Sequence, residues 1–60
     1  MSAPQRWDYK TVDIKPGFLG MKMEDVQNEL DKYGKQGWEL VSVAPLAARA
    51  SLVLFFKRPA

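Results

Sequence analysis

The 60-residue sequence contains no cysteine and no histidine. Their absence excludes disulfide bonds, thiolate zinc sites, histidine metal ligands and a histidine general base. The chain is also short, and at 6.8 kDa it forms one domain at most, which buries only about 60% of the surface that its unfolded chain exposes. Because no disulfide can stabilise so small a core, we expect self-association to supply the missing stability.

An excess of one charge sign is also lacking, because nine basic and seven acidic side chains give a net charge of +2. This weak balance argues against a nucleic-acid partner. Residues 1–6 lack the apolar run of a secretory signal, and the longest apolar run, residues 52–56, is too short to span a membrane. We therefore expect a cytoplasmic protein that has no cofactor and no membrane contact.

The first part of the chain reads as a flexible tail over residues 1–5 and a strand over residues 7–14, within a single domain of residues 6–60. The strand alternates imperfectly, with Trp7, Tyr9 and Thr11 on one face and Val12 and Ile14 on the other. Either both faces are covered along part of the strand, or a bulge shifts its register. Pro16 and Gly17 end it, with the glycine taking the positive φ of a type II turn.

The middle of the chain has helical periodicity from Met23 onward. Apolar side chains spaced three or four residues apart predict one stripe of a helix of about four turns: Met23, Val26, Leu30 and Tyr33. Gly37 is suited to the left-handed position that follows a helix. Gly34 indicates either close packing or an earlier helix end.

Two further strands follow, over residues 38–44 and 51–57, with Pro45 ending the first and a loop of about six residues between them. A loop of this length predicts an antiparallel hairpin. The last strand is apolar on both faces, so it should be central, which gives an α+β fold with a three-stranded sheet in the order 2-3-1 and one helix on one face. A parallel pairing of the first two strands through a right-handed crossover is the alternative.

The hairpin register that joins opposite charges places Glu39 opposite Lys57. One face then carries the bulkier residues that should meet the helix: Trp38, Leu40, Leu52, Leu54 and Phe56. The other face carries a second apolar set, Val41, Val43, Val53 and Phe55. Since no further element covers this second set, we predict that it forms the interface of a homodimer or higher oligomer.

The same topology gathers aromatic and basic residues at one end of the sheet: Arg6, Trp7, Trp38, Lys57 and Arg58. Such a group is typical of sites that stack a base and pair with phosphates, and Arg49 in the loop could add to it. In the alternative interpretation, the tryptophans close the core and the cations solubilise the terminus. The chain has no G-x-S-x-G or phosphate-loop motif, so we expect no enzyme.

Four stretches of the sequence resemble one known family: Trp7-Asp-Tyr-Lys10, Lys15-Pro-Gly-Phe-Leu-Gly20, Gly37-Trp-Glu-Leu-Val-Ser-Val43 and the closing Phe56-Lys-Arg-Pro59. They are similar to the short bacterial and phage family catalogued as domain of unknown function 4177. The resemblance implies a compact strand-helix-strand-strand domain and carries over no catalytic residue. We therefore expect a non-enzymatic, self-associating binding or regulatory module, or alternatively a protein that sequesters or senses an anionic ligand such as a nucleotide, or binds nucleic acid weakly.

Overall fold

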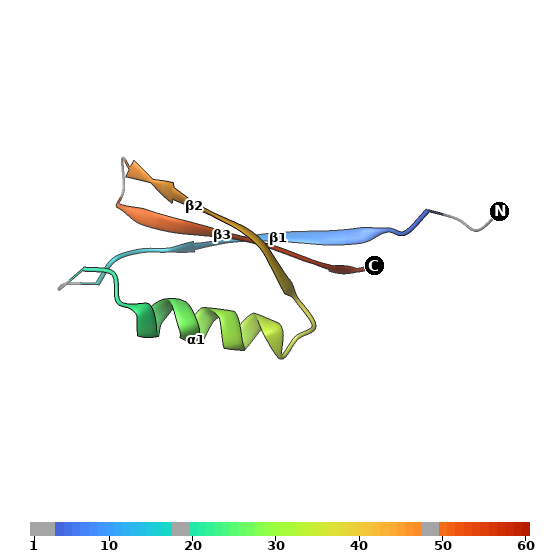
Figure 1. Ribbon diagram of the computed structural model, residues 1–60, viewed down its shortest axis with the longest axis horizontal. Coiled ribbons are helices and arrows are strands. Elements are labelled where there is room, and N and C mark those ends of the chain that lie inside the picture. Colours follow the sequence, from blue (N-terminus) through green and yellow to red (C-terminus); the bar gives the residue numbers. More distant parts are fainter. Residues whose placement is uncertain (1–3, 18–19, 48–49) are drawn as a thin grey trace.

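The computed structural model describes residues 4–17, 20–47 and 50–60. Its elements follow the order β1 (Trp7–Ile14), α1 (Met23–Gly34), β2 (Glu39–Leu46) and β3 (Ser51–Pro59). The strands form one antiparallel sheet in the order β1-β3-β2, with the helix on one side (Figure 1). The predicted α+β fold and central third strand are thus confirmed. Because β1 and β2 both pair with β3, the alternative of a parallel β1–β2 pair is wrong.

The predicted tail and first turn lie partly outside the described residues, which exclude 1–3 and 18–19. Strand β1 ends at Ile14, as predicted, and the backbone groups of Gly17 and Gly20 then exchange two hydrogen bonds of 3.3 and 3.0 Å. Gly20 has a positive φ of +97°, whereas Gly17 does not lie in the left-handed region. The turn therefore differs from the predicted type II turn, in which Gly17 would have taken the left-handed conformation.

Helix α1 ends at Gly34, just after the last residue of its apolar stripe and about one turn before Gly37, and this confirms the alternative of an earlier end. Gly37 still performs the predicted capping role. It has a φ of +89°, its N–H donates to the Gly34 carbonyl at 3.0 Å, and the Trp38 N–H donates to the Tyr33 carbonyl at 3.0 Å. This pair of bonds is a Schellman motif, which satisfies the last helical carbonyls and turns the chain into β2.

The strand registers show where alternation is interrupted. Strand β1 pairs with β3 without a break from Trp7 to Ile14, so the bulge suggested for β1 is absent there. The predicted pairing of Glu39 with Lys57 is confirmed, but the register of β2 shifts between Leu40 and Ser42. The shift leaves Val41 as an extra residue, so that Val41 and Ser42 together oppose Phe55.

This bulge corrects the predicted face of Val43. After the shift, Val43 pairs with Leu54 and therefore lies on the side of the sheet that the helix covers, not with Val53 and Phe55. Because side chains alternate strictly along a strand, one inserted residue exchanges the faces of all residues that follow it.

Both strands of the hairpin extend beyond their predicted ends. Strand β2 continues through Pro45 to Leu46, with Pro45 opposite Leu52. A proline is tolerated there because β2 is an edge strand, whose outward-facing backbone needs no N–H donor. Strand β3 continues to Pro59, opposite Trp7.

The core lies between the helix and the middle of the sheet. Among the described residues, three apolar side chains are buried: Leu54 and Phe56 fully, and Ile14 with 7% of its surface exposed. The helix contributes Val26, Leu30 and Tyr33 to this cluster, as predicted, whereas Met23 is 90% exposed. The stripe therefore begins one turn later than the periodicity indicated.

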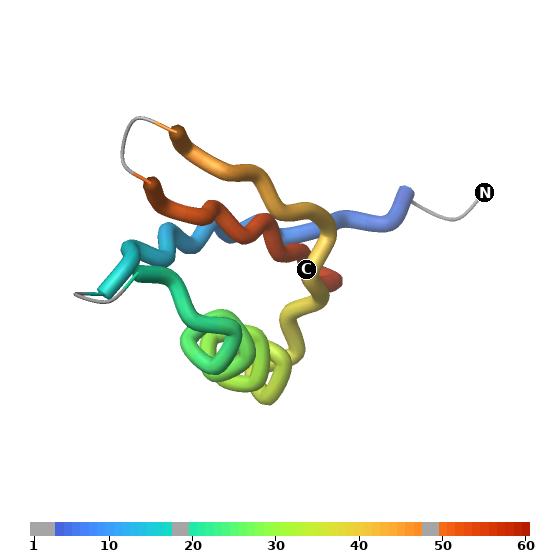
Figure 2. The backbone as a smooth tube through the Cα atoms, turned by 60° about the vertical axis from the view of Figure 1, so that its left-hand side comes forward, coloured from blue at the N-terminus to red at the C-terminus, as the bar shows by residue number. Residues whose placement is uncertain are grey.

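The molecule is long and thin, with Cα extents of 53 × 24 × 10 Å. Figure 2 shows the helix on one side of the sheet, with the start of β2 near the end of the helix and the rest of β2 running away from it. The radius of gyration is 13.8 Å, against roughly 10 Å for a compact chain of this length. Such a shape leaves much of the sheet accessible to a partner.

Candidate functional site

The outer face of the sheet, turned away from α1, is the larger candidate site. The registers place the side chains of Trp7, Tyr9 and Thr11 of β1 on this face together with Val53 and Phe55 of the central strand. Phe55 is 38% exposed, Trp7 37% and Tyr9 72%. Three of the four predicted interface residues, Val41, Val53 and Phe55, thus come together here, and Val43 does not.

The predicted basic and aromatic end is divided between the two faces. On the outer face, the Lys57 Nζ lies 4.4 Å from the centroid of the Trp7 ring. On the helix side, the Arg58 Cζ lies 4.2 Å from the centroid of Trp38, and the Arg58 guanidinium also donates to the Gln36 carbonyl at 2.8 Å. Consecutive residues of a strand point to opposite faces, so Lys57 and Arg58 cannot serve one site.

A second candidate site lies on the helix side, where three cations surround two aromatic rings. The Lys10 Nζ lies 5.5 Å from the Tyr33 centroid and 5.3 Å from the Trp38 centroid. The Lys32 Nζ lies 5.2 Å from the Tyr33 centroid, and the Arg58 guanidinium lies over the Trp38 ring. We call these five residues the inner cation cluster. Cations at such distances are attracted by the ring quadrupole, and their positive charge is thereby held in one small region.

Sequence reasoning missed three members of the inner cation cluster: Lys10, Lys32 and Tyr33. The alternation of β1 contains the missing signal for Lys10, because this residue pairs with Phe56 and so faces the helix. Tyr33 was predicted only as part of the helix stripe, and its ring also lies 5.3 Å from Phe56. A stripe residue at the end of a helix can therefore serve both the core and a surface site.

The other two residues predicted for the ligand site, Arg6 and Arg49, are not part of the inner cation cluster. The Arg6 carbonyl accepts a hydrogen bond from the Ala60 N–H at 3.0 Å, which joins the two ends of the domain, and the Arg6 side chain is exposed. Arg49, the predicted addition from the loop, lies outside the described residues.

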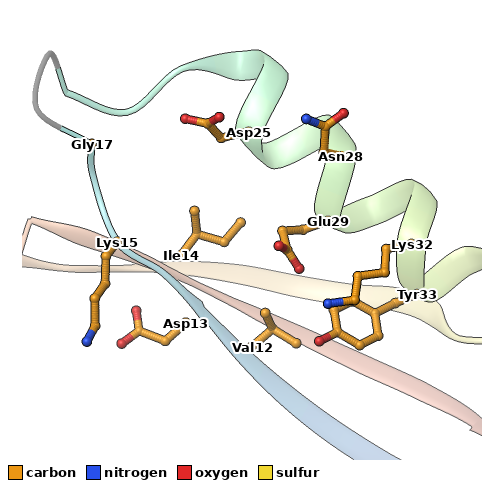
Figure 3. Close-up of a pocket in the computed structure, with 10 residues that line it drawn as sticks. All are labelled: Val12, Asp13, Ile14, Lys15, Gly17, Asp25, Asn28, Glu29, Lys32 and Tyr33. Carbon is orange, nitrogen blue, oxygen red and sulfur yellow. The ribbon is translucent and has the colours of Figure 1, made fainter.

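An open cavity of about 570 Å³ lies between β1 and α1 (Figure 3). In the figure, Ile14 and Glu29 lie between the strand and the helix, and Asp25 and Asn28 project from the helix. Among the described residues, its lining mixes both charge signs and includes no serine, threonine, cysteine or histidine. Within the described part of the chain, no group of three acidic, histidine or cysteine side chains could hold a metal ion.

No helix among the residues described is long and apolar enough to cross a membrane. No curated protein and no solved structure matches the chain. A family model does match it, over residues 7–59, and that family is described as a domain of unknown function, DUF4177. The match begins at the first residue of β1 and ends at the last residue of β3, so it covers the whole fold described above. The chain therefore belongs to the DUF4177 family.

Proposed function

We propose that this chain is a non-enzymatic, cytoplasmic binding or regulatory module that acts as a self-associated assembly, in which a second copy covers the outer face of the sheet. The proposal is supported mainly by the uncovered apolar side chains on the outer face. Its aromatic and aliphatic residues have no covering element in the part of the chain that the structure describes, since α1 lies on the opposite side. Monomers rarely leave such side chains exposed together.

The accessible surface supports this proposal. It amounts to 4845 Å², whereas a compact monomer of 6.8 kDa exposes roughly 4,000 Å². This surplus reflects the elongated shape of the chain, which leaves the outer face open to a partner. Among the described residues only Leu54 and Phe56 are fully buried, so burial of Phe55, Val53 and Trp7 in an interface would add apolar contacts to a small core.

Sedimentation equilibrium at micromolar concentration tests the proposal. We expect the wild-type chain to sediment at a multiple of 6.8 kDa and Phe55→Glu to shift towards the monomer, because a carboxylate would be buried in the interface. Met23→Glu is the matched control, since this 90% exposed side chain lies on the helix and should leave the mass unchanged. A wild-type chain that stays monomeric would overturn the proposal.

The second candidate function is binding of a small anionic ligand, such as a nucleotide, and the inner cation cluster favours it. Lys10 and Arg58 both lie against Trp38, so their positive charges lie near one ring on which a base could stack. This site replaces the predicted group at the end of the sheet, because Trp7 and Lys57 belong to the other face.

A fluorescence titration distinguishes this candidate. In the Trp7→Phe background, only Trp38 remains to report binding of ATP or inorganic pyrophosphate. Binding at the inner cation cluster would quench Trp38 saturably, would weaken as salt is added, and would weaken further in Lys10→Met. Lys15→Met, which removes an exposed cation outside the cluster, is the control. An unchanged signal at low salt would contradict the candidate function.

A further inference from the structure

The two edges of the sheet differ in how well they resist pairing with another strand. Edge strand β2 carries two features that block it, the register shift after Leu40 and the missing N–H of Pro45. Edge strand β1 has neither a proline nor a bulge over its eight residues, and its register is regular from end to end. A long, regular edge strand presents a row of unpaired backbone groups that can bind a further strand.

The accessible part of this edge is its N-terminal half. In Figure 1, the blue half of β1 projects beyond the last turn of α1, whereas its C-terminal half runs alongside the helix. The exposure of the strand agrees with this arrangement, because residues 7–9 are exposed and Ile14 is buried. An incoming strand would therefore meet the least obstruction around Tyr9.

We propose that β1 pairs antiparallel with β1 of a further copy, distinct from the copy that covers the outer face, across a two-fold axis that passes by Tyr9, and that the two sheets thereby become one. The inference rests on the proposed self-association and names a specific contact within it. Main-chain hydrogen bonds along β1 hold this contact, and they add to whatever the outer face contributes.

Charge complementarity selects this register. A two-fold axis perpendicular to the sheet leaves each side chain on its own face. Because side chains alternate along a strand, residues that oppose each other must then differ by an even number of positions. One residue therefore lies opposite its own copy at the centre of the pairing. With Tyr9 at the centre, Asp8 lies opposite Lys10 of the partner subunit, and the symmetry repeats this pair. Both side chains are on the helix side, since Asp8 pairs with Arg58 and Lys10 with Phe56 within one chain.

Neighbouring registers lack this match. Centring on Lys10 places it opposite Lys10 of the partner subunit, which sets like charges against each other. Centring on Thr11 places Asp8 opposite Ile14 of the partner subunit and Lys10 opposite Val12 of the partner subunit, so both charges face apolar residues. Of these three registers, only the one centred on Tyr9 places opposite charges across from each other.

The helices also fit the Tyr9 register. Because the strands are antiparallel, the half of each β1 that lies beside its own helix meets the projecting half of the other β1. The two helices therefore lie on the same face but at opposite ends of the paired strands. A centre near Ile14 would instead bring both helices to the same place.

Cysteine cross-linking tests the register directly. The chain has no cysteine, so a single introduced thiol forms a disulfide only between copies. Directly opposed Cβ atoms in a sheet lie about 4.5–5.5 Å apart, near the range that a disulfide bridges. With oxidised glutathione as oxidant, we expect Tyr9→Cys to give a disulfide-linked dimer. Thr11→Cys is the control on the same face, because its two copies would lie about 13 Å apart along the strands.

A charge exchange provides the second test. Asp8→Lys alone and Lys10→Asp alone each set like charges opposite one another, and each should weaken the β1 contact by roughly fivefold or more. An equal mixture of the two variants restores opposite charges, so native mass spectrometry should show mixed dimers in excess of either homodimer. This outcome is specific to a contact in which residues 8 and 10 face each other.

The outcomes separate the two proposals. If the wild-type chain is monomeric at micromolar concentration, the proposed self-association fails and the β1 contact fails with it. If the wild-type chain assembles but Tyr9→Cys cross-links no faster than Thr11→Cys, only the β1 contact is overturned. A mixture of charge variants with no excess of mixed dimers overturns it in the same way.

Discussion

The two faces of the sheet each receive one of two neighbouring phenylalanines of the central strand, and the two rings end in different environments. Phe55 and Phe56 are neighbours on the central strand, yet Phe56 is 1% exposed and Phe55 is 38% exposed. Strand geometry points them in opposite directions, and the single helix covers only the side of Phe56. The difference shows that hydrophobicity alone did not decide burial here. The number of covering elements did.

The faces are alike in one respect, because each places a cation over a tryptophan. Lys57 lies over Trp7 on the outer face, and Arg58 lies over Trp38 on the helix side. On the helix side the arrangement is denser, since Lys10 and Lys32 add two further cations around Tyr33. The outer face is therefore the more apolar candidate for a protein partner, and the helix side is the more cationic candidate for a small anion.

The largest effect is expected when Phe55 and Phe56 are each truncated to alanine, which tests the difference between the two faces. We expect Phe56→Ala to lower the free energy of unfolding by about 3–5 kcal/mol, because it leaves a cavity in the small core. Phe55→Ala should cost about 1 kcal/mol in the monomer, because its side chain remains partly in water. Urea unfolding followed by circular dichroism measures both changes.

Protein concentration sharpens the same comparison. If Phe55 lies in an interface, the loss caused by Phe55→Ala should grow with protein concentration, since assembly stabilises only the folded chain. The loss caused by Phe56→Ala should appear at every concentration. If both variants lose the same stability at every protein concentration, assembly does not distinguish the two faces.

An intermediate effect is expected at the turn that joins the helix to the sheet. Gly37→Ala should lower stability by about 1–2 kcal/mol, because a side chain at a φ of +89° is strained. Gly34→Ala, the matched control, should be neutral or raise stability by up to about 1 kcal/mol, since a methyl group there meets nothing within 4 Å. Thermal unfolding measures both, and shifts in the same direction would contradict the capping role of Gly37.

The smallest effect concerns the cations on each face. Lys10→Met keeps the aliphatic stem and removes the charge near two rings, and it should cost about 0.5–1 kcal/mol. Lys57→Met removes a charge near one ring and should cost less, because Trp7 is more accessible to water. A larger loss for Lys57→Met in urea unfolding would reverse this ranking of the two faces.

The sequence by itself determined the order and type of the elements. Alternation in residues 7–14 and 51–57, the helical spacing from Val26 to Tyr33, and the glycine at position 37 are local patterns, and local conformation follows from them. The central position of β3 also followed, because only that strand is apolar on both faces. The same alternation placed Val53 and Phe55 on one face, as the register has them, and their part in an interface stays a prediction.

Only the tertiary structure decided which side chains share a site. The bulge after Leu40 moved Val43 to the helix side, and nothing in the local sequence marks an extra residue, since its cause is the pairing with β3. The division of Trp7 from Trp38, and the meeting of Lys10 with Tyr33, likewise depend on cross-strand register and on the position of the helix. Local patterns set the conformation of each segment, whereas contacts between segments distant in sequence set the sites, because they arise only when the strands pair.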